Sequence, residues 1–111
     1  MNILLETDKN NSEYRYYRGV AYMATEKYEK ASKDFKKSMD KGNDEIGCLY
    51  NYGICAIMSE DYENGLEALQ KVIDRDENKE YSKGAKDLID QIYKAVEEAA
   101  LAEAEAEAAE G

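Results

Sequence analysis

The sequence repeats itself with a period of 34 residues, and this period restricts the fold more than any other feature of the chain. Residues 12–45 align with residues 46–79 without a gap. Residues of the same kind or size recur at aligned positions: Tyr16 and Tyr50, Gly19 and Gly53, Tyr28 and Tyr62, Phe35 and Leu69, Asp40 and Asp74. A period of this length is typical of stacked supersecondary units that share one continuous core.

Each unit is predicted to contain two helices. They span about 13–24 and 28–41 in the first unit, and about 45–58 and 62–75 in the second. Apolar residues recur three and four positions apart along the second helix of each unit, as one buried helix face requires. The chain contains no Pro, and it lacks the sustained alternation that indicates strands. The sequence therefore predicts an all-α chain.

Two glycines at equivalent positions need a packing explanation. Gly19 and Gly53 lie inside predicted helices, where Gly destabilises by roughly 0.5–1 kcal/mol relative to Ala. We expect the two helices of each unit to cross closely there, with Ala31 and Gly65 as the small residues that face the glycines. In this arrangement a side chain at the crossing would find no room.

Two short patterns connect both units with a known repeat family. The patterns are Gly19-x-Ala21-Tyr22 with Tyr28-x-x-Ala31-x-x-x-Phe35, and Gly53-x-Cys55-Ala56 with Tyr62-x-x-Gly65-x-x-x-Leu69. Together with the repeat length, they resemble the tetratricopeptide repeat (TPR). The resemblance implies a TPR-type alpha-alpha superhelix, an alpha solenoid of antiparallel helix pairs with a capping helix. It also implies a scaffold that binds other proteins, not an enzyme.

The period and the composition divide the chain into four parts. Residues 12–45 and 46–79 are the two predicted units, and residues 80–111 are a predicted capping helix with an Ala/Glu-rich tail. The cap follows from one apolar stripe: Ala85, Leu88, Ile89, Ile92, Tyr93 and Val96. Residues 1–11 fall in the register of a preceding unit, so we interpret them as its remnant. The chain would then be the end of a longer array.

Charge and residue types exclude several functions. The net charge of −10 argues against nucleic acid, although six of the acidic residues lie in the tail at 97–111. The chain has no His, so we expect no metal, no cofactor and no catalysis. Cys48 and Cys55 would be about 10.5 Å apart on one helix, too far for a disulfide, so we interpret them as packing residues. The sequence has no membrane span and no signal peptide, which predicts a cytoplasmic protein.

In TPR arrays the first helix of each unit lines a concave groove. The resemblance therefore assigns a partner-binding surface to Glu13, Tyr16, Tyr17, Val20, Met23, Gly47, Tyr50, Asn51, Ile54, Ile57 and Met58, with Tyr81 and Ala85 from the last helix. TPRs that bind a carboxylate terminus use Lys, Arg and Asn at five of these positions. Only Asn51 matches here, because Tyr16, Val20, Tyr81 and Ala85 occupy the other four.

An apolar groove rich in Tyr and Met is suited to a peptide or an amphipathic helix. We therefore predict a protein-interaction scaffold that is not of the carboxylate-clamp type. Two alternatives stay open at this point. The groove or the array ends could pair copies of the chain, or the aromatic residues could be core. Tyr22, Tyr28, Tyr52 and Tyr62 are expected to be core.

Overall fold

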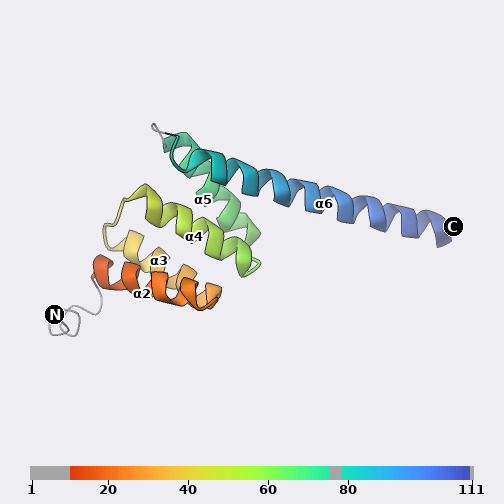
Figure 1. Cartoon of the computed structure of the whole chain (residues 1–111). Coiled ribbons are helices and arrows are strands. Elements are labelled where there is room, and N and C mark those ends of the chain that lie inside the picture. The colour runs from red at the N-terminus through yellow and green to blue at the C-terminus, as the bar shows by residue number, and fades with distance from the viewer. Residues whose placement is uncertain (1–10, 76–78, 111) are drawn as a thin grey trace.

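The computed structural model describes residues 11–75 and 79–110. These residues form five helices: α2 (Ser12–Ala24), α3 (Tyr28–Asp40), α4 (Ile46–Met58), α5 (Tyr62–Arg75) and α6 (Ser82–Glu110). No strand occurs in the described ranges, and the all-α prediction is confirmed (Figure 1). The proposed remnant at residues 1–11 lies outside the described residues, except for Asn11. The Asn11 side chain caps α2 by accepting a 2.6 Å hydrogen bond from the backbone N–H of Tyr14.

The two tight turns that join paired helices have the same local structure. The hydroxyls of Thr25 and Ser59 each donate to the backbone carbonyl four residues earlier and so satisfy a carbonyl at the helix end. The next residues, Glu26 and Glu60, both adopt the left-handed conformation, with φ of 61° and 70°. The 34-residue period is therefore repeated in backbone geometry as well as in residue type.

The glycines lie where the paired helices cross. A methyl group at Gly19 would lie 2.9 Å from the ring of Phe35, and one at Gly53 would lie 2.9 Å from a methyl of Leu69. A methyl group at Gly65 would lie 3.1 Å from the backbone oxygen of Gly53, so these two glycines face each other as expected. The close backbone approach predicted for the second unit is therefore confirmed.

Two apolar clusters make up the core of the described residues. One is centred on fully buried Phe35, with Ala31 and the two cysteines. The other is centred on Leu69 and Val72, with Leu49, Ala68 and Ala85. Met39 and Tyr52 pack against both clusters, so the core is continuous from one helix pair to the next.

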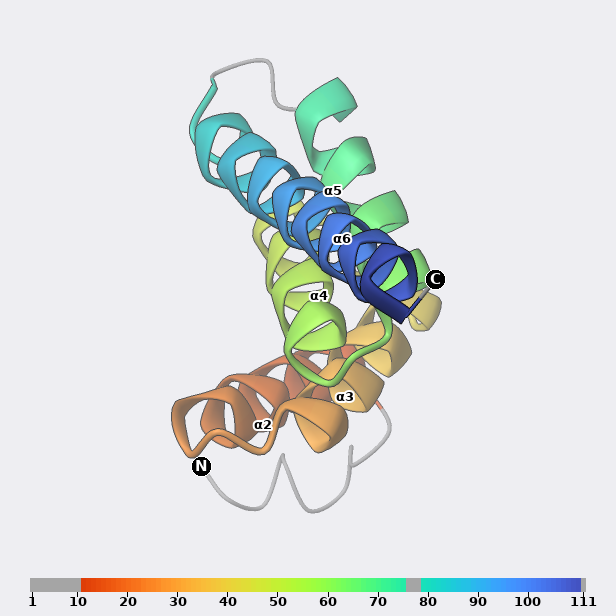
Figure 2. The ribbon, with the colours of Figure 1, turned by 90° about the vertical axis from the view of Figure 1, so that its right-hand side faces the viewer.

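The helices pack in chain order, with α2 on α3, α3 on α4, α4 on α5 and α5 on α6. Figure 2 shows the pair α2–α3 below the pair α4–α5, with α6 crossing the upper pair. The C-terminal half of α6 projects away from the body (Figure 1). Near the middle of α6, Tyr93 and Val96 are each 61% exposed.

The expectation that Tyr62 is core is wrong. Its side chain is 48% exposed, whereas Tyr28 at the equivalent position packs against the Phe35 cluster. Tyr62 is the first residue of α5, and α6 begins beside the other end of that helix (Figure 1). Since Val96 is also exposed, α6 leaves α5 before it could cover Tyr62.

Candidate functional site

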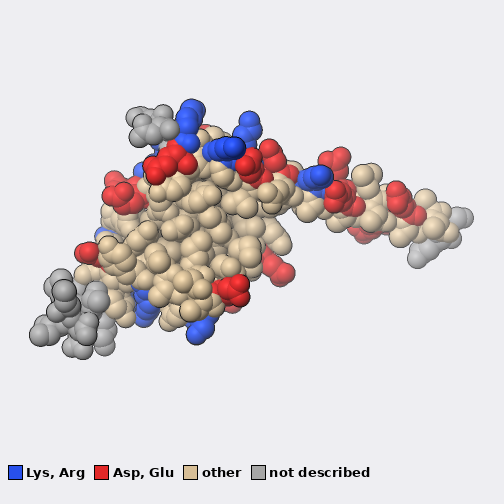
Figure 3. All heavy atoms as spheres, in the orientation of Figure 1, with Lys and Arg blue, Asp and Glu red and all other residues tan. Residues whose placement is uncertain are grey.

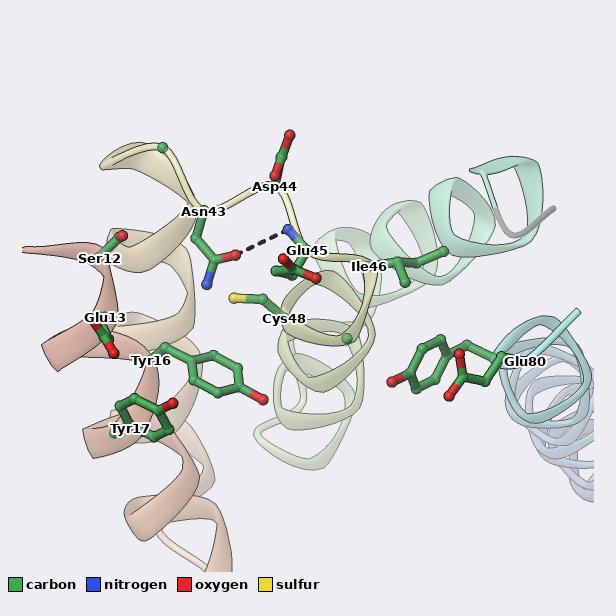
Figure 4. Close-up of a pocket in the computed structure, with 13 residues that line it drawn as sticks. Ser12, Glu13, Tyr16, Tyr17, Asn43, Asp44, Glu45, Ile46, Cys48 and Glu80 are labelled. Atoms are coloured by element: carbon green, nitrogen blue, oxygen red, sulfur yellow. Dashed lines mark hydrogen bonds between the residues drawn. The ribbon is translucent and has the colours of Figure 1, made fainter. Parts of the chain in front are cut away.

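A pocket of about 610 Å³ lies where α2, the start of α4 and the segment before α6 come together. Its lining consists of Ser12, Glu13, Tyr16 and Tyr17 from α2, residues 42–45 from the α3–α4 loop, Ile46, Gly47 and Cys48 from α4, and Glu80 and Tyr81. Figure 4 shows Tyr16 and Tyr17 on one side of the first turns of α4 and Glu80 on the other. We call the surface formed by α2, α4 and the start of α6 the groove.

The α2 wall is formed by two tyrosines with different roles. Tyr16 is half-buried, with its ring 5.7 Å from that of Phe35, so the core fixes its orientation. Burial raises the pKa of the Tyr16 hydroxyl, and nearby Glu45 adds to this effect, so the hydroxyl stays a neutral donor. Tyr17 stacks edge-on against Tyr16 at 5.4 Å and is 59% exposed. Tyr17 therefore offers a free aromatic face at the pocket.

Hydrogen bonds hold the α3–α4 loop at the edge of the pocket. The Asn43 side chain donates to the hydroxyl of Ser38 at 2.9 Å and accepts from the backbone N–H of Glu45 at 3.0 Å (Figure 4 shows the second bond). Ser38 is fully buried and donates in turn to the carbonyl of Ser12 at 2.6 Å. Gly42 has a φ of 107°, a conformation that other residues rarely adopt. These contacts fix the backbone from which Asp44 and Glu45 extend.

The floor of the pocket is the first turn of α4. Gly47 lets the hydroxyl of Tyr81 come close to the helix, because a methyl group at this position would lie only 3.2 Å from that hydroxyl. Cys48 is fully buried behind it. Burial raises the pKa of Cys48 and of Cys55 to about 11, so both stay protonated thiols near neutral pH. This agrees with the interpretation of both cysteines as packing residues.

Five of the predicted groove residues line this pocket: Glu13, Tyr16, Tyr17, Gly47 and Tyr81. Val20 follows one turn further along α2 and is 39% exposed. Asn51 and Ile54 are half-buried on α4. These positions follow the first helices of both pairs, as the resemblance implied, and their role in binding stays a prediction.

The other predicted residues make contacts within the fold. Tyr50 packs against Tyr81 at 5.1 Å and lies next to Gly84, so the start of α6 covers it. Ile57 packs into the α4–α5 crossing against Gly65, and Met23 packs against the Phe35 cluster.

Two further positions differ from the expected groove. Met58 is 54% exposed but lines a different pocket, next to Tyr28 and Lys30. Ala85 was also expected in the groove, and this is wrong, because its side chain is fully buried in the core cluster that α6 shares with α5.

Sequence reasoning missed the acidic groups of the pocket. Asp44, Glu45 and Glu80 line it together with Glu13. The resemblance assigns groove residues by their register in the repeat and gives no such position to Asp44, Glu45 or Glu80. The one available signal was that an acidic residue stands at or just before the start of α2, α4 and α6.

Within the described residues, no group of three or more metal-ligating side chains could hold a metal ion. None of the helices that the structure describes is long and apolar enough to cross a membrane. Figure 3 shows the face formed by α2 and α4 as largely uncharged, with acidic side chains near the edge where the helices begin.

Helix pairs stacked in chain order, with the 34-residue period repeated in their turns, are the features of a TPR-like helical repeat protein. The sequence agrees, because the family described as anaphase-promoting complex, cyclosome, subunit 3 matches residues 1–72. The chain belongs to this family, which confirms the TPR resemblance. TPR-like families generally mediate protein–protein interactions and are typically non-enzymatic scaffolds. No curated protein matches the chain.

Proposed function

We propose that this chain is a protein-interaction scaffold that holds an apolar peptide or an amphipathic helix of a partner in the groove. The observation that carries the proposal is the pocket that Tyr16, Tyr17 and Tyr81 line together with Gly47. Tyr side chains supply large contact areas at low entropy cost, and exposed Val20 lies one turn further along α2. A family named after a subunit of a complex is consistent with this role.

The same observations support a functional division of the chain. Residues 12–45 and 46–79 would be the two units that supply the groove, and residues 80–111 would be the cap. Equivalent glycines at the crossings and equivalent turns at Glu26 and Glu60 support two units. The polar outer side of α6, with exposed Lys86, Asp87 and Asp90, supports a cap.

A partner with a free carboxylate in the pocket is disfavoured. Of the residues used by carboxylate-clamp TPRs only Asn51 is present, and the pocket carries acidic side chains of its own. Like charges in a shared site repel. The proposed partner segment therefore lies in the groove through apolar contacts.

The test compares partner capture by two surfaces of the same chain. Tyr17→Ala with Val20→Ala removes exposed side chains from the groove, and Tyr62→Ala removes an exposed ring from α5 as the control. We expect the groove variant to lose captured partners at unchanged helical content by circular dichroism, and the control to keep them. Equal capture by both variants would reject the groove as the binding surface.

A second candidate function is the pairing of copies through α6. The observation that favours it is the exposure of Tyr93, Val96 and Leu101 along the middle and C-terminal part of the helix. Light scattering over a range of concentrations separates this candidate from the first. A mass that stays monomeric at every concentration contradicts pairing and leaves the groove proposal unaffected.

A further inference from the structure

The charges of the pocket have one sign. Glu13, Asp44, Glu45 and Glu80 line it, and no Lys or Arg is among its described lining residues. We call these four residues the acidic mouth. The ion pairs found among the described residues involve none of them. Arg75 donates to the backbone carbonyl of Asp44 and is not part of the pocket lining.

Helix dipoles account for only part of this charge. Glu13 lies in the first turn of α2 and Glu45 precedes α4, where a carboxylate stabilises the helix. Asp44 and Glu80 lie outside the helices, yet they border the same pocket. The acidic mouth therefore places more negative charge around one cavity than the helix ends explain.

The walls between these carboxylates are aromatic. Tyr16 and Tyr17 stand on the α2 side, and Tyr81 stands across Gly47. A positively charged group is attracted both by carboxylates and by the faces of aromatic rings. Lys and Arg also bring an apolar stem that can lie along such rings while the charged end reaches the acidic groups. The pocket thus fits a Lys or Arg side chain better than a purely apolar one.

We infer that the partner segment carries a Lys or Arg, and that this side chain enters the pocket while neighbouring apolar side chains lie along Val20 and Ile54. The inference rests on the proposed function and specifies the chemistry of the partner. The cationic residue is an internal one, because the carboxylate of a C-terminal residue would be repelled by the acidic mouth. Charge complementarity also sets the position of the bound segment, because its cation lies at the end of the groove where α4 begins.

The experiment selects ligands without assuming a partner. The whole chain is immobilised and used to select from a phage-displayed library of random peptides. The most enriched sequence is synthesised with both ends blocked, once as selected and once with its cation replaced by uncharged citrulline or norleucine. Binding of each peptide is titrated by fluorescence anisotropy at low and high salt.

Three forms of the chain are compared in the titration. The first is wild type. The second carries Glu13→Gln and Glu80→Gln in the acidic mouth. The third carries Glu63→Gln on α5 and Glu97→Gln on α6, which removes the same number of charges from exposed positions elsewhere.

We expect selected peptides to combine Lys or Arg with apolar residues. The mouth variant should bind about fivefold more weakly than wild type, as expected for two exposed charges, and the matched control should bind like wild type. The uncharged peptide should lose affinity for wild type and be insensitive to the mouth substitutions. High salt should weaken the charged peptide more than the uncharged one.

Other outcomes separate this inference from the proposed function. Purely apolar peptides that lose binding with Tyr17→Ala and Val20→Ala would overturn the cationic partner but keep the groove. Equal weakening by the mouth variant and its matched control would overturn the inference as well, because only net charge would then matter. Failure to enrich any peptide that depends on the groove would count against both.

Discussion

Both helix pairs cross at equivalent glycines, but they differ on the face directed toward the N-terminal end of the stack. In the pair α2–α3, Arg15 and Arg18 bond to buried Asp34. In the pair α4–α5, Leu49 and Tyr52 stand at the positions of the two arginines, and Ala68 stands at the position of Asp34. The repeat period thus places an ionic network in one pair where the other has apolar core.

The two faces have different neighbours, which explains the difference. Leu49 and Ala68 are 8% and 3% exposed because α3 of the preceding pair packs there, with Met39 against their cluster. Asp34 is 3% exposed as well, but the arginines that cover it are themselves partly exposed, at 22% and 37% of their side chains. A carboxylate can be buried there because two guanidinium groups supply its hydrogen bonds. The glycine crossings are common to both helix pairs. Whether a face of a pair is apolar or ionic depends on whether another helix pair packs against it.

The largest expected effect comes from placing the ionic residue in the apolar pair. Ala68→Asp would bury a carboxylate where Leu49 and Tyr52 replace the two arginines, and we expect the free energy of unfolding to fall by about 3 kcal/mol. Urea denaturation followed by circular dichroism measures the loss. Adding Tyr52→Arg supplies the equivalent of Arg18 and should recover part of the lost free energy of unfolding. A loss below about 1 kcal/mol would show that the two faces are interchangeable.

A smaller effect is expected when the network itself is broken. Asp34→Ala leaves Arg15 and Arg18 without their buried partner, and partial exposure of both arginines limits the loss to about 2 kcal/mol. Asp40→Ala is the matched control, because it removes an exposed ion pair with Lys36. The control should change stability by less than about 0.5 kcal/mol. Equal losses for the two substitutions in urea would mean that the network adds nothing beyond a surface pair.

The smallest effect distinguishes the two crossings. Gly19→Ala would press a methyl group against the Phe35 ring, which is rigid and fully buried, and we expect a loss of about 1–2 kcal/mol. Gly53→Ala meets the Leu69 side chain, its methyl at 2.9 Å and its Cγ at 3.0 Å, and we expect a smaller loss of about 1 kcal/mol, because an aliphatic side chain adjusts more readily than an aromatic ring. Thermal unfolding of both variants measures the order. A larger loss for Gly53→Ala would contradict this account of the crossings.

The features that could be predicted from the sequence are those that repeat. Gly19, Gly53 and Gly65 could be placed because a helix crossing demands small residues wherever it recurs. Tyr62 could not be placed correctly, since its exposure depends on the path of α6 and not on its own unit. The prediction for Ala85 was wrong for a related reason, because the path of α6 places this side chain in the core and not on the groove surface.

The candidate site could be predicted only where helices supply it. Glu13, Tyr16 and Tyr17 follow from the position of α2 in the register. The acidic mouth depends on connecting segments whose course is set by contacts far apart in sequence, such as the bond from Ser38 to the carbonyl of Ser12. No periodicity encodes such contacts. The chemistry that we propose for the partner therefore rests on where the loops lie around the pocket.

The most direct test of a partner held in the groove is paramagnetic broadening of backbone amide signals. The selected peptide carries a nitroxide label next to its cationic residue and is added to the isotope-labelled chain. The account predicts the strongest broadening at Gly47 and its neighbours on α2 and near Tyr81, and little at α3 or α5. Broadening centred on α3 or α5, with the signal of Gly47 unchanged, would contradict it.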